Sequence, residues 1–249
     1  MGAGKVYIVG AGPGDPELLT LKASRLLSEA DVVIYDRLVD PNILRFCRDA
    51  ELIYAGKERG ESWRQAEVNR IIAEKALEGK KVVRLKGGDP LIFGRTGEEM
   101  LYLSSRGIDL EVVPGVSSVT AAPAAALIPL TLRGLSSSIG ITSGSSMGGG
   151  VTDIRRLASA ADTLIVMMWL TKARELQLQL EGIGLGDKPA AIVSNATTYG
   201  QRLVFTDVRS LVDAAGHLDS SSPSLLIIGD VVTVGKTLHS RSAVAVEVR

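Results

Sequence analysis

The feature that most constrains this fold is a regular alternation of short, β-type apolar runs with amphipathic helical segments. Strands that alternate with helices usually pair in parallel, and the helices then cover the faces of the sheet. The first half of the sequence therefore predicts a mostly parallel α/β sheet. Its expected strands are residues 5–9, 31–35, 52–54, 82–85 and 110–113, and its expected helices are residues 17–29, 66–77 and 97–105.

The alternation stops near residue 115 and then starts again. Residues 117–126 are mostly small and include one proline, which is typical either of a tightly packed helix or of a hinge region. We therefore expect two α/β domains, residues 1–114 and 115–249, with mainly parallel, mixed sheets. In the second domain the expected strands are residues 138–142, 163–169, 190–194, 203–206 and 224–229, and the expected helices are residues 172–180 and 209–215.

Composition narrows the classes of function. Hydrophobic residues make up 45% of the 249 residues, and 28 basic residues balance 28 acidic ones. Partners such as nucleic acid or a membrane surface usually require a basic excess, so neither is expected. No apolar run approaches the ~18 residues of a membrane-spanning helix, and the start is too strand-like for a signal peptide. One cysteine, Cys47, and two histidines give no basis for a disulfide or a metal. We expect a cytoplasmic protein.

The segment Lys86-Gly87-Gly88-Asp89-Pro90 ends one of the expected strands abruptly. Glycines allow backbone angles and close approaches that other residues do not, and Pro90 prevents a simple continuation of the strand. Asp89 would then present a carboxylate at the strand end, where α/β proteins commonly bind ligands. A plain strand-to-helix turn with a solvated aspartate explains the local pattern equally well.

A second glycine-rich turn, Gly10-Ala-Gly-Pro-Gly-Asp15, lies where a dinucleotide-binding fingerprint would be. The fingerprint requires a glycine where this chain has Asp15, and Pro13 removes a backbone donor from the turn. We therefore do not expect a nicotinamide cofactor here. The turn could form the wall of a cleft, or it could be a tight turn that places Asp15 near a helix N-terminus.

Six motifs follow one another along the chain and together resemble the tetrapyrrole methylase family, most of all its uroporphyrinogen branch. They are Val6-Tyr-Ile-Val-Gly-Ala-Gly-Pro-Gly-Asp15, Ala30-Asp-Val-Val-Ile-Tyr-Asp-Arg-Leu-Val39, Gly56-Lys57, Val83-Arg-Leu-Lys-Gly-Gly-Asp-Pro90, Val112-Val-Pro-Gly-Val-Ser117 and Ile128-Pro-Leu-Thr131. The resemblance implies two α/β domains with a ligand cleft between them, a homodimer, and S-adenosylmethionine as methyl donor. It implies C-methylation of uroporphyrinogen III, by way of precorrin-1, to precorrin-2 in sirohaem or cobalamin biosynthesis.

The resemblance also assigns residues to roles. Asp36 and Lys57 fall on the positions proposed in the family for proton handling, as acceptor and donor. A carboxylate at a strand end is chemically suited to take the proton that ring methylation releases. The positions implied for donor binding are Pro13, Gly87, Gly88, Asp89, Ile92, Ser117, Ser118, Met168 and Ala196.

Several residues depart from the family pattern on the side expected to bind the acceptor. Leu132 and Ser145 stand where histidines are usual, and Trp169 replaces a glycine beside Met168, which we expect to change the volume of the cleft. A set of basic residues could still bind a polycarboxylate, namely Arg37, Arg59, Arg64, Arg84, Lys86, Arg95 and Arg133. Two alternatives therefore stay open: methylation of another electron-rich heteroaromatic, such as an indole or pyrrole metabolite, and a non-catalytic donor-binding protein.

Overall fold

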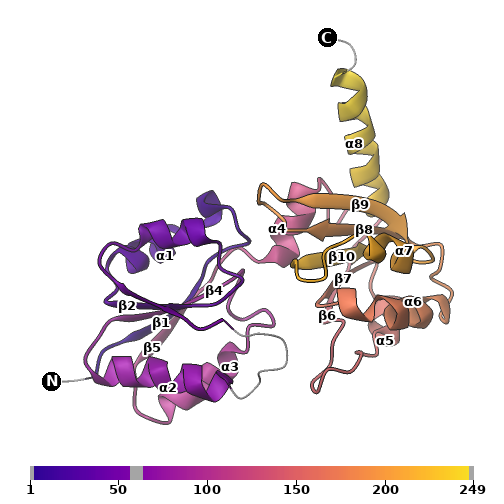
Figure 1. Ribbon diagram of the computed structural model, residues 1–249. Helices are drawn as coiled ribbons and strands as arrows, with labels where there is room; N and C mark the ends of the chain where they lie inside the picture. The colour runs from indigo at the N-terminus through magenta and orange to yellow at the C-terminus, as the bar shows by residue number, and fades with distance from the viewer. Residues whose placement is uncertain (1–2, 57–63, 247–249) are drawn as a thin grey trace. The chain divides into compact units, whose positions relative to one another are not determined.

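The computed structural model describes residues 3–56 and 64–246 (Figure 1). The chain folds into two compact units, Met1–Ser118 and Val119–Arg249. The domain boundary that the sequence predicts falls after residue 114, slightly before this division. Each unit is an α/β layer structure with its own sheet and its own hydrophobic core.

The first unit is built on a parallel sheet. Within the described residues it has five strands in the order β3-β2-β4-β1-β5, and every pairing is parallel. The register sets Tyr35 opposite Leu85, and Gly10 opposite Lys86. The mostly parallel sheet predicted for this half is confirmed. The strands are β1 (Val6–Gly10), β2 (Val32–Tyr35), β3 (Glu51–Tyr54), β4 (Val82–Lys86) and β5 (Leu110–Val113).

Helices cover both faces of this sheet, as Figure 1 shows. On one face, α1 (Leu21–Ser28) buries Leu26 and Leu27, and such side chains each stabilise the fold by about 1.5–3 kcal/mol. On the other face lie α2 (Arg64–Leu77) and α3 (Thr96–Ser104). The helix expected at residues 17–29 is divided. A 3₁₀ helix, Pro16–Leu18, comes first, and the Thr20 side chain then caps α1 by accepting from the Ala23 N–H.

The second unit has a mixed sheet. Its five described strands lie in the order β6-β7-β10-β8-β9, in which only β6 and β7 are parallel. The chain therefore combines one parallel and one mixed sheet, as the predicted fold class requires, but antiparallel pairs predominate in the second. The strands are β6 (Ile139–Ser143), β7 (Thr163–Met167), β8 (Pro189–Ser194), β9 (Arg202–Asp207) and β10 (Ser224–Ile228).

The helices of the second unit include some that the sequence patterns do not reveal. The expected helices correspond to α6 (Ala173–Glu181) and α7 (Leu211–Gly216). The short helix α5 (Arg155–Ala160) and the helix α8 (Val232–Val246) are additional. The small-residue stretch near residue 120 is a helix, α4 (Ser118–Ala125), with Pro123 inside it. Among the described residues, no helix combines the length and apolarity needed to cross a membrane.

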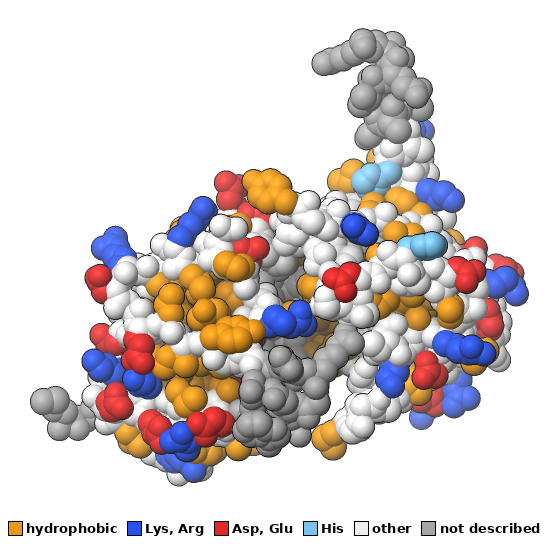
Figure 2. Space-filling view, in the orientation of Figure 1, with side chains coloured by type: hydrophobic (Ala, Val, Ile, Leu, Met, Phe, Trp, Pro, Cys, Tyr) orange, Lys and Arg blue, Asp and Glu red, His pale blue; other side chains and the backbone are white. Residues whose placement is uncertain are grey.

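The visible face of the first unit carries charges of both signs around a central apolar area (Figure 2). Figure 2 shows acidic and basic side chains interspersed on its visible face. Many of them form surface pairs, such as Lys5 with Glu111 (3.1 Å) and Lys75 with Glu51 (2.7 Å). Exposed pairs of this kind contribute little to stability. The charges that matter for a site are those held inside the unit.

Candidate functional site

The candidate site of the first unit lies where its strands end. Because all five strands are parallel, their carboxyl ends share one edge of the sheet, which is where α/β proteins commonly bind ligands. Asp36 follows β2, Gly87 follows β4, Ala11 follows β1 and Pro114 follows β5. Residues that are far apart in the sequence therefore meet at this edge.

Three glycines allow the strand-end loops to approach each other closely. A Cβ placed on Gly10 would lie 2.6 Å from both the Gly115 Cα and the Gly88 carbonyl oxygen, and one on Gly115 would lie 2.4 Å from that oxygen. The turn around Pro13 is joined to this group, because Gly12 and Gly88 exchange backbone hydrogen bonds of 3.2 and 2.7 Å. Glycine is thus required here by main-chain packing.

Gly88 also has an open side. Its φ of +66° is in the left-handed region, and a Cβ on it would meet only the Ser118 N, at 3.8 Å. The Ser118 N therefore faces Gly88 across a gap that a single Cβ would fill. Gly87 differs, since a Cβ there would lie 2.8 Å from the Leu38 Cβ. The glycine at 87 is required by the packing of the loop that follows β2.

Asp89 ties two of the loops together. One carboxylate oxygen accepts from the Leu91 N–H (2.8 Å) and the other from the Gly115 N–H (3.1 Å). The Asp89 backbone carbonyl accepts from the Ile92 N–H at 3.3 Å, which holds Ile92 in the turn. The carboxylate is therefore not simply solvated, as a plain turn would leave it. It joins the β4 loop to the β5 loop, and each oxygen retains a lone pair for a ligand.

Asp36 is held in a defined orientation at the end of β2. Its Oδ1 accepts from the Leu38 N–H at 3.1 Å, and its Oδ2 accepts from the Arg84 Nη2 at 2.9 Å. The Asp36 side chain keeps 24% of its surface exposed, whereas Arg84 is buried. The carboxylate thus has a buried cation behind it and solvent-accessible surface in front. Lys57, the other residue expected to handle protons, lies outside the described residues.

Behind Asp36 lies a group of charged side chains between the sheet and helices α2 and α3. Arg84 and Lys86 alternate with Val83 and Leu85 along β4, so both cations point to the face that α2 and α3 cover. Glu99 of α3, which is fully buried, accepts from both (3.2 and 3.0 Å). Burial lowers the pKa of Lys86, and Arg84 lowers it further, while Glu99 opposes both effects.

This burial corrects one expectation from the sequence. Arg84 and Lys86 are 4% and 5% exposed and are paired with carboxylates, so they are not available to bind a polycarboxylate at the surface. Arg95 is paired with Glu98 at 2.6 Å. Arg37 of the first unit and Arg133 of the second are exposed, as is Arg95 in its pair with Glu98. Arg59 and the Arg64 side chain lie outside the part of the chain that the structure describes.

In the second unit, Met168 and Ala196 lie at the same edge of the mixed sheet. β7 ends at Met167 and β8 at Ser194, and β10, which begins opposite both, brings the two ends to one edge. The backbone there is strained, since Met168, Asn195 and Thr197 have φ values of +50°, +48° and +65°. Left-handed conformations at non-glycine residues cluster at functional sites. The Ser145 hydroxyl donates to the Met168 carbonyl at 3.0 Å.

Trp169 does not face a cleft, contrary to the expectation. Its side chain is fully buried in the core of the second unit, together with Leu176 and Leu180. Gly144 makes room for it, because a Cβ on Gly144 would lie 2.7 Å from the Trp169 Cα. The change from glycine to tryptophan therefore alters the core beneath Met168.

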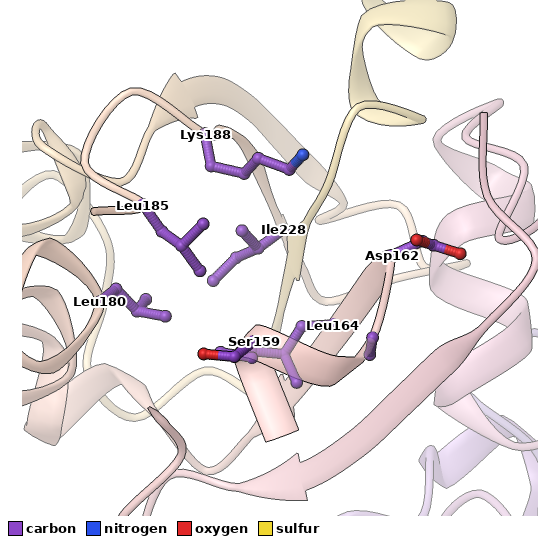
Figure 3. Close-up of a pocket in the computed structure, with 9 residues that line it drawn as sticks. Ser159, Asp162, Leu164, Leu180, Leu185, Lys188 and Ile228 are labelled. Atoms are coloured by element: carbon purple, nitrogen blue, oxygen red, sulfur yellow. The ribbon is translucent and has the colours of Figure 1, made fainter. Parts of the chain in front are cut away.

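A separate pocket lies at the opposite edge of the second sheet (Figure 3). It has a volume of about 220 Å³ and an apolar lining that includes Leu164, Leu180 and Ile228. Its charged residues are already engaged: Lys188 pairs with Asp230 at 2.8 Å, and Asp162 accepts from the Ser137 N–H at 2.8 Å. These contacts indicate a structural packing gap. Among the residues that the structure describes, no cluster of His, Cys, Asp or Glu is arranged to hold a metal ion.

Comparison with known proteins decides the family. Residues 5–212 match the model of the tetrapyrrole (corrin/porphyrin) methylases. The chain belongs to this family. It is 42% identical to the uroporphyrinogen-III C-methyltransferase of Methanocaldococcus jannaschii, over 93% of this chain and 98% of that protein. It is 46% identical to the siroheme synthase of Nitrosospira multiformis, of which it spans about half (51%).

A solved structure shows the same fold. The uroporphyrin-III C-methyltransferase of Thermus thermophilus, complexed with S-adenosylhomocysteine, aligns with a TM-score of 0.81 and 43% identity. The alignment covers 93% of this chain and all of that one. The methylase chain described here therefore has the two-domain α/β architecture that the resemblance implies.

The buried group around Glu99 is the feature that reasoning from the sequence missed. A signal for it exists in the sequence. Two cations at alternate positions of a strand whose neighbours are apolar must be buried on one face, and buried charges require partners. Glu99, in a helix close behind the strand, is such a partner.

Proposed function

We propose that this chain is an S-adenosylmethionine-dependent C-methyltransferase that converts uroporphyrinogen III, by way of precorrin-1, to precorrin-2. The observation that carries the proposal is the 42% identity to the Methanocaldococcus jannaschii uroporphyrinogen-III C-methyltransferase over 98% of that protein's length. The sirohaem or cobalamin pathway then follows from the product. The sequence similarity to about half of a siroheme synthase is consistent with the sirohaem pathway.

The site residues fit a methyl donor. The open side of Gly88, which only the Ser118 N approaches within 4 Å, provides a cradle that any side chain at 88 would fill. Main-chain groups near Pro13, Gly87 and Ser117, the second lone pairs of Asp89, and the apolar side chain of Ile92 would hold the donor. The family resemblance assigns Met168, which is 51% exposed on a strained backbone, and Ala196 to donor binding as well. S-adenosylmethionine, when bound, supplies a methyl group already activated on a sulfonium.

The chain itself then has two tasks, alignment and proton handling. In the reaction, the acceptor carbon forms the bond to the methyl group, the bond to sulfur breaks, and the cationic macrocycle must lose a proton. Holding donor and acceptor in line can supply a large part of the rate. Asp36, fixed by Leu38 and Arg84, is placed to accept that proton or to direct its loss, and Lys57 would act as donor.

The experiment is an anaerobic incubation with S-adenosylmethionine and enzymatically made uroporphyrinogen III, with mass spectrometry of the product. A product that carries two additional methyl groups supports the proposal. Donor binding without any methylated macrocycle would contradict it, and transfer to an indole or pyrrole metabolite in a parallel reaction would favour the diverged methyltransferase. Donor binding without transfer to any acceptor would favour a binding protein.

The role of Asp36 can be separated from general damage to the strand. Asp36→Asn should lower kcat by roughly 10²-fold or more, as loss of a proton-transfer group does. Asp31→Asn is the matched control, because Asp31 lies at the other end of β2 and accepts from the Lys81 N–H (2.7 Å). Equal rates for Asp36→Asn and the control would exclude a catalytic role for Asp36.

We also propose a homodimer in the cytoplasm, and a domain boundary in the sequence after residue 114. Family resemblance supports the dimer, and the composition supports the location. Size-exclusion chromatography with light scattering tests the dimer, and a monomeric mass would contradict it.

A further inference from the structure

Among the described residues of the first unit, the buried charges Glu99, Arg84 and Lys86 connect to Asp36, and the function proposed above gives Glu99 and Lys86 no role. We define the Glu99 cluster as Glu99, Arg84, Lys86 and Asp36, with Gln65 and Asn69 of α2 at its side. Glu99 is 0% exposed, and the two cations are almost as inaccessible. A charge that is buried without partners is strongly disfavoured, so each member depends on the others.

Glu99 is the hub of this cluster. Its Oε1 accepts from the Arg84 Nε at 3.2 Å and from the Gln65 Nε2 at 3.1 Å, while its Oε2 accepts from the Lys86 Nζ at 3.0 Å. Gln65 is in turn connected to Asn69 at 3.0 Å. The carboxylate is thus bound on both oxygens, and it links β4 to α2 and α3.

Arg84 transmits this constraint to Asp36. Its Nε binds Glu99, its Nη2 binds Asp36 at 2.9 Å, and its Nη1 donates to the backbone carbonyls of Ile34 (3.3 Å) and Leu85 (3.0 Å). A guanidinium is planar and carries its donors in a fixed fork. Once Nε and Nη1 are bound, the position of Nη2, and with it the orientation of the Asp36 carboxylate, is determined.

The charges of the cluster also balance. Arg84 and Lys86 from β4 oppose Glu99 from α3 and Asp36, which follows β2, while the described contacts from α2 are the uncharged amides of Gln65 and Asn69. Arg37, the neighbour of Asp36 in the chain, is exposed. The buried cations are therefore matched by carboxylates within the cluster.

We propose that Glu99 is a positioning residue that fixes Arg84 against Asp36, so that the Asp36 carboxylate faces the site in one orientation. The consequence for catalysis rests on the proposed methyl transfer, whereas the structural part does not. Glu99 acts through Arg84 and need not touch a substrate.

The kinetic test compares charge variants by their pH–rate profiles. Arg84→Gln removes the cation beside Asp36, so the acid limb should move to higher pH. Glu99→Gln should reduce kcat at the plateau by roughly tenfold or more but should not raise the acid limb. Arg84 keeps its charge in this variant. Burial already lowers the pKa of Lys86, so Lys86 can release a proton when the neutral glutamine replaces Glu99. A residue that merely supports the fold would not separate the two variants in this way.

Two further variants complete the kinetic test. Glu98→Gln is the matched control, because Glu98 lies beside Glu99 on α3 but is exposed and paired with Arg95. The Glu98→Gln variant should behave as the wild type. Arg84→Lys keeps the charge but cannot span both carboxylates, so it should lower kcat and leave the acid limb in place. Wild-type kcat in folded Glu99→Gln, or an unmoved acid limb in Arg84→Gln, would overturn the proposal.

A second measurement does not depend on turnover or on any variant of Glu99. In ¹⁵N NMR of the free wild-type protein, the Arg84 Nε–H should be protected from solvent exchange, and Asp36→Asn should shift the Arg84 Nη signals. Arg84→Lys assigns the resonance. Rapid exchange of that N–H would refute the proposal even if Glu99→Gln failed to fold. If the wild type did not methylate uroporphyrinogen III, the proposed function would fail, while this NMR result would still decide the role of Glu99.

Discussion

The strand-end glycines offer the sharpest test of how this site is built. In Gly10→Ala the new Cβ would lie 2.6 Å from the backbone of Gly115 and from the Gly88 carbonyl oxygen. Ordinary van der Waals contact of a Cβ begins at 3.4 Å, so the loops that carry Gly10, Gly88 and Gly115 would have to move apart by about 0.8 Å. The obstacles are all main chain, and no rotamer change can relieve them. The φ of Gly10 is not in the left-handed region, so the whole cost is steric.

The expected cost follows from overpacking. Such insertions destabilise by about 1–3 kcal/mol, and each kcal/mol lowers Tm by about 2–4 °C for a chain of this size. We therefore expect Tm to fall by roughly 2–12 °C in differential scanning calorimetry, with weaker S-adenosylhomocysteine binding. Gly97→Ala is the control, because nothing lies within 4 Å of its new Cβ and alanine favours a helix, so Tm should hold or rise. Equal Tm for Gly10→Ala and the wild type would refute the packing argument.

Three further predictions concern other parts of the chain. Trp169→Phe should cost clearly less in denaturant titration than Trp169→Ala, which should cost about 3–5 kcal/mol, because phenylalanine leaves the smaller cavity and the Trp169 Nε1 has no hydrogen-bond partner among the described residues to lose; equal costs would contradict this. Hydrogen bonds from Lys22 and Lys5 lower the pKa of Glu111, so its contribution to stability is present above its ordinary pKa and is lost as the pH falls through the lowered value. Glu111→Gln should thus lower Tm at neutral pH but not at strongly acid pH, and a pH-independent difference would be inconsistent. Burial raises the pKa of the half-buried Cys47 thiol, so a thiol reagent at neutral pH should modify it more slowly than free cysteine, and an equal rate would refute this.

Much of the fold could be predicted from periodicity alone. The parallel sheet of the first unit follows from its alternation of strands and helices, since parallel strands need a long crossover connection, which is usually a helix. The antiparallel pairs of the second unit were less evident. The short connection from β8 to β9, which contains no helix, was the available sign. Helix α8 was hidden because it begins with β-branched residues and contains Gly235, which is needed where the helix packs against Ile128.

The site was harder to predict because glycine and aspartate serve more than one purpose. Gly87 and Asp89 were singled out as ligand contacts, yet the structure shows each also holding neighbouring loops in place. Trp169 was expected at a surface, and only the three-dimensional packing with Gly144 places it in the core. Arg84 was expected to bind a substrate carboxylate and instead binds Glu99 and Asp36, a choice that depends on which face of β4 it occupies.

The central claim is that this chain transfers methyl groups from S-adenosylmethionine to ring carbons of uroporphyrinogen III. The most direct measurement is an anaerobic reaction with ¹³C-methyl-labelled donor, followed by ¹³C NMR of the isolated macrocycle. We predict two labelled methyl groups per macrocycle, both with the chemical shift of a methyl on saturated carbon. Label on oxygen or nitrogen, or a macrocycle without label while the donor binds, would contradict the account.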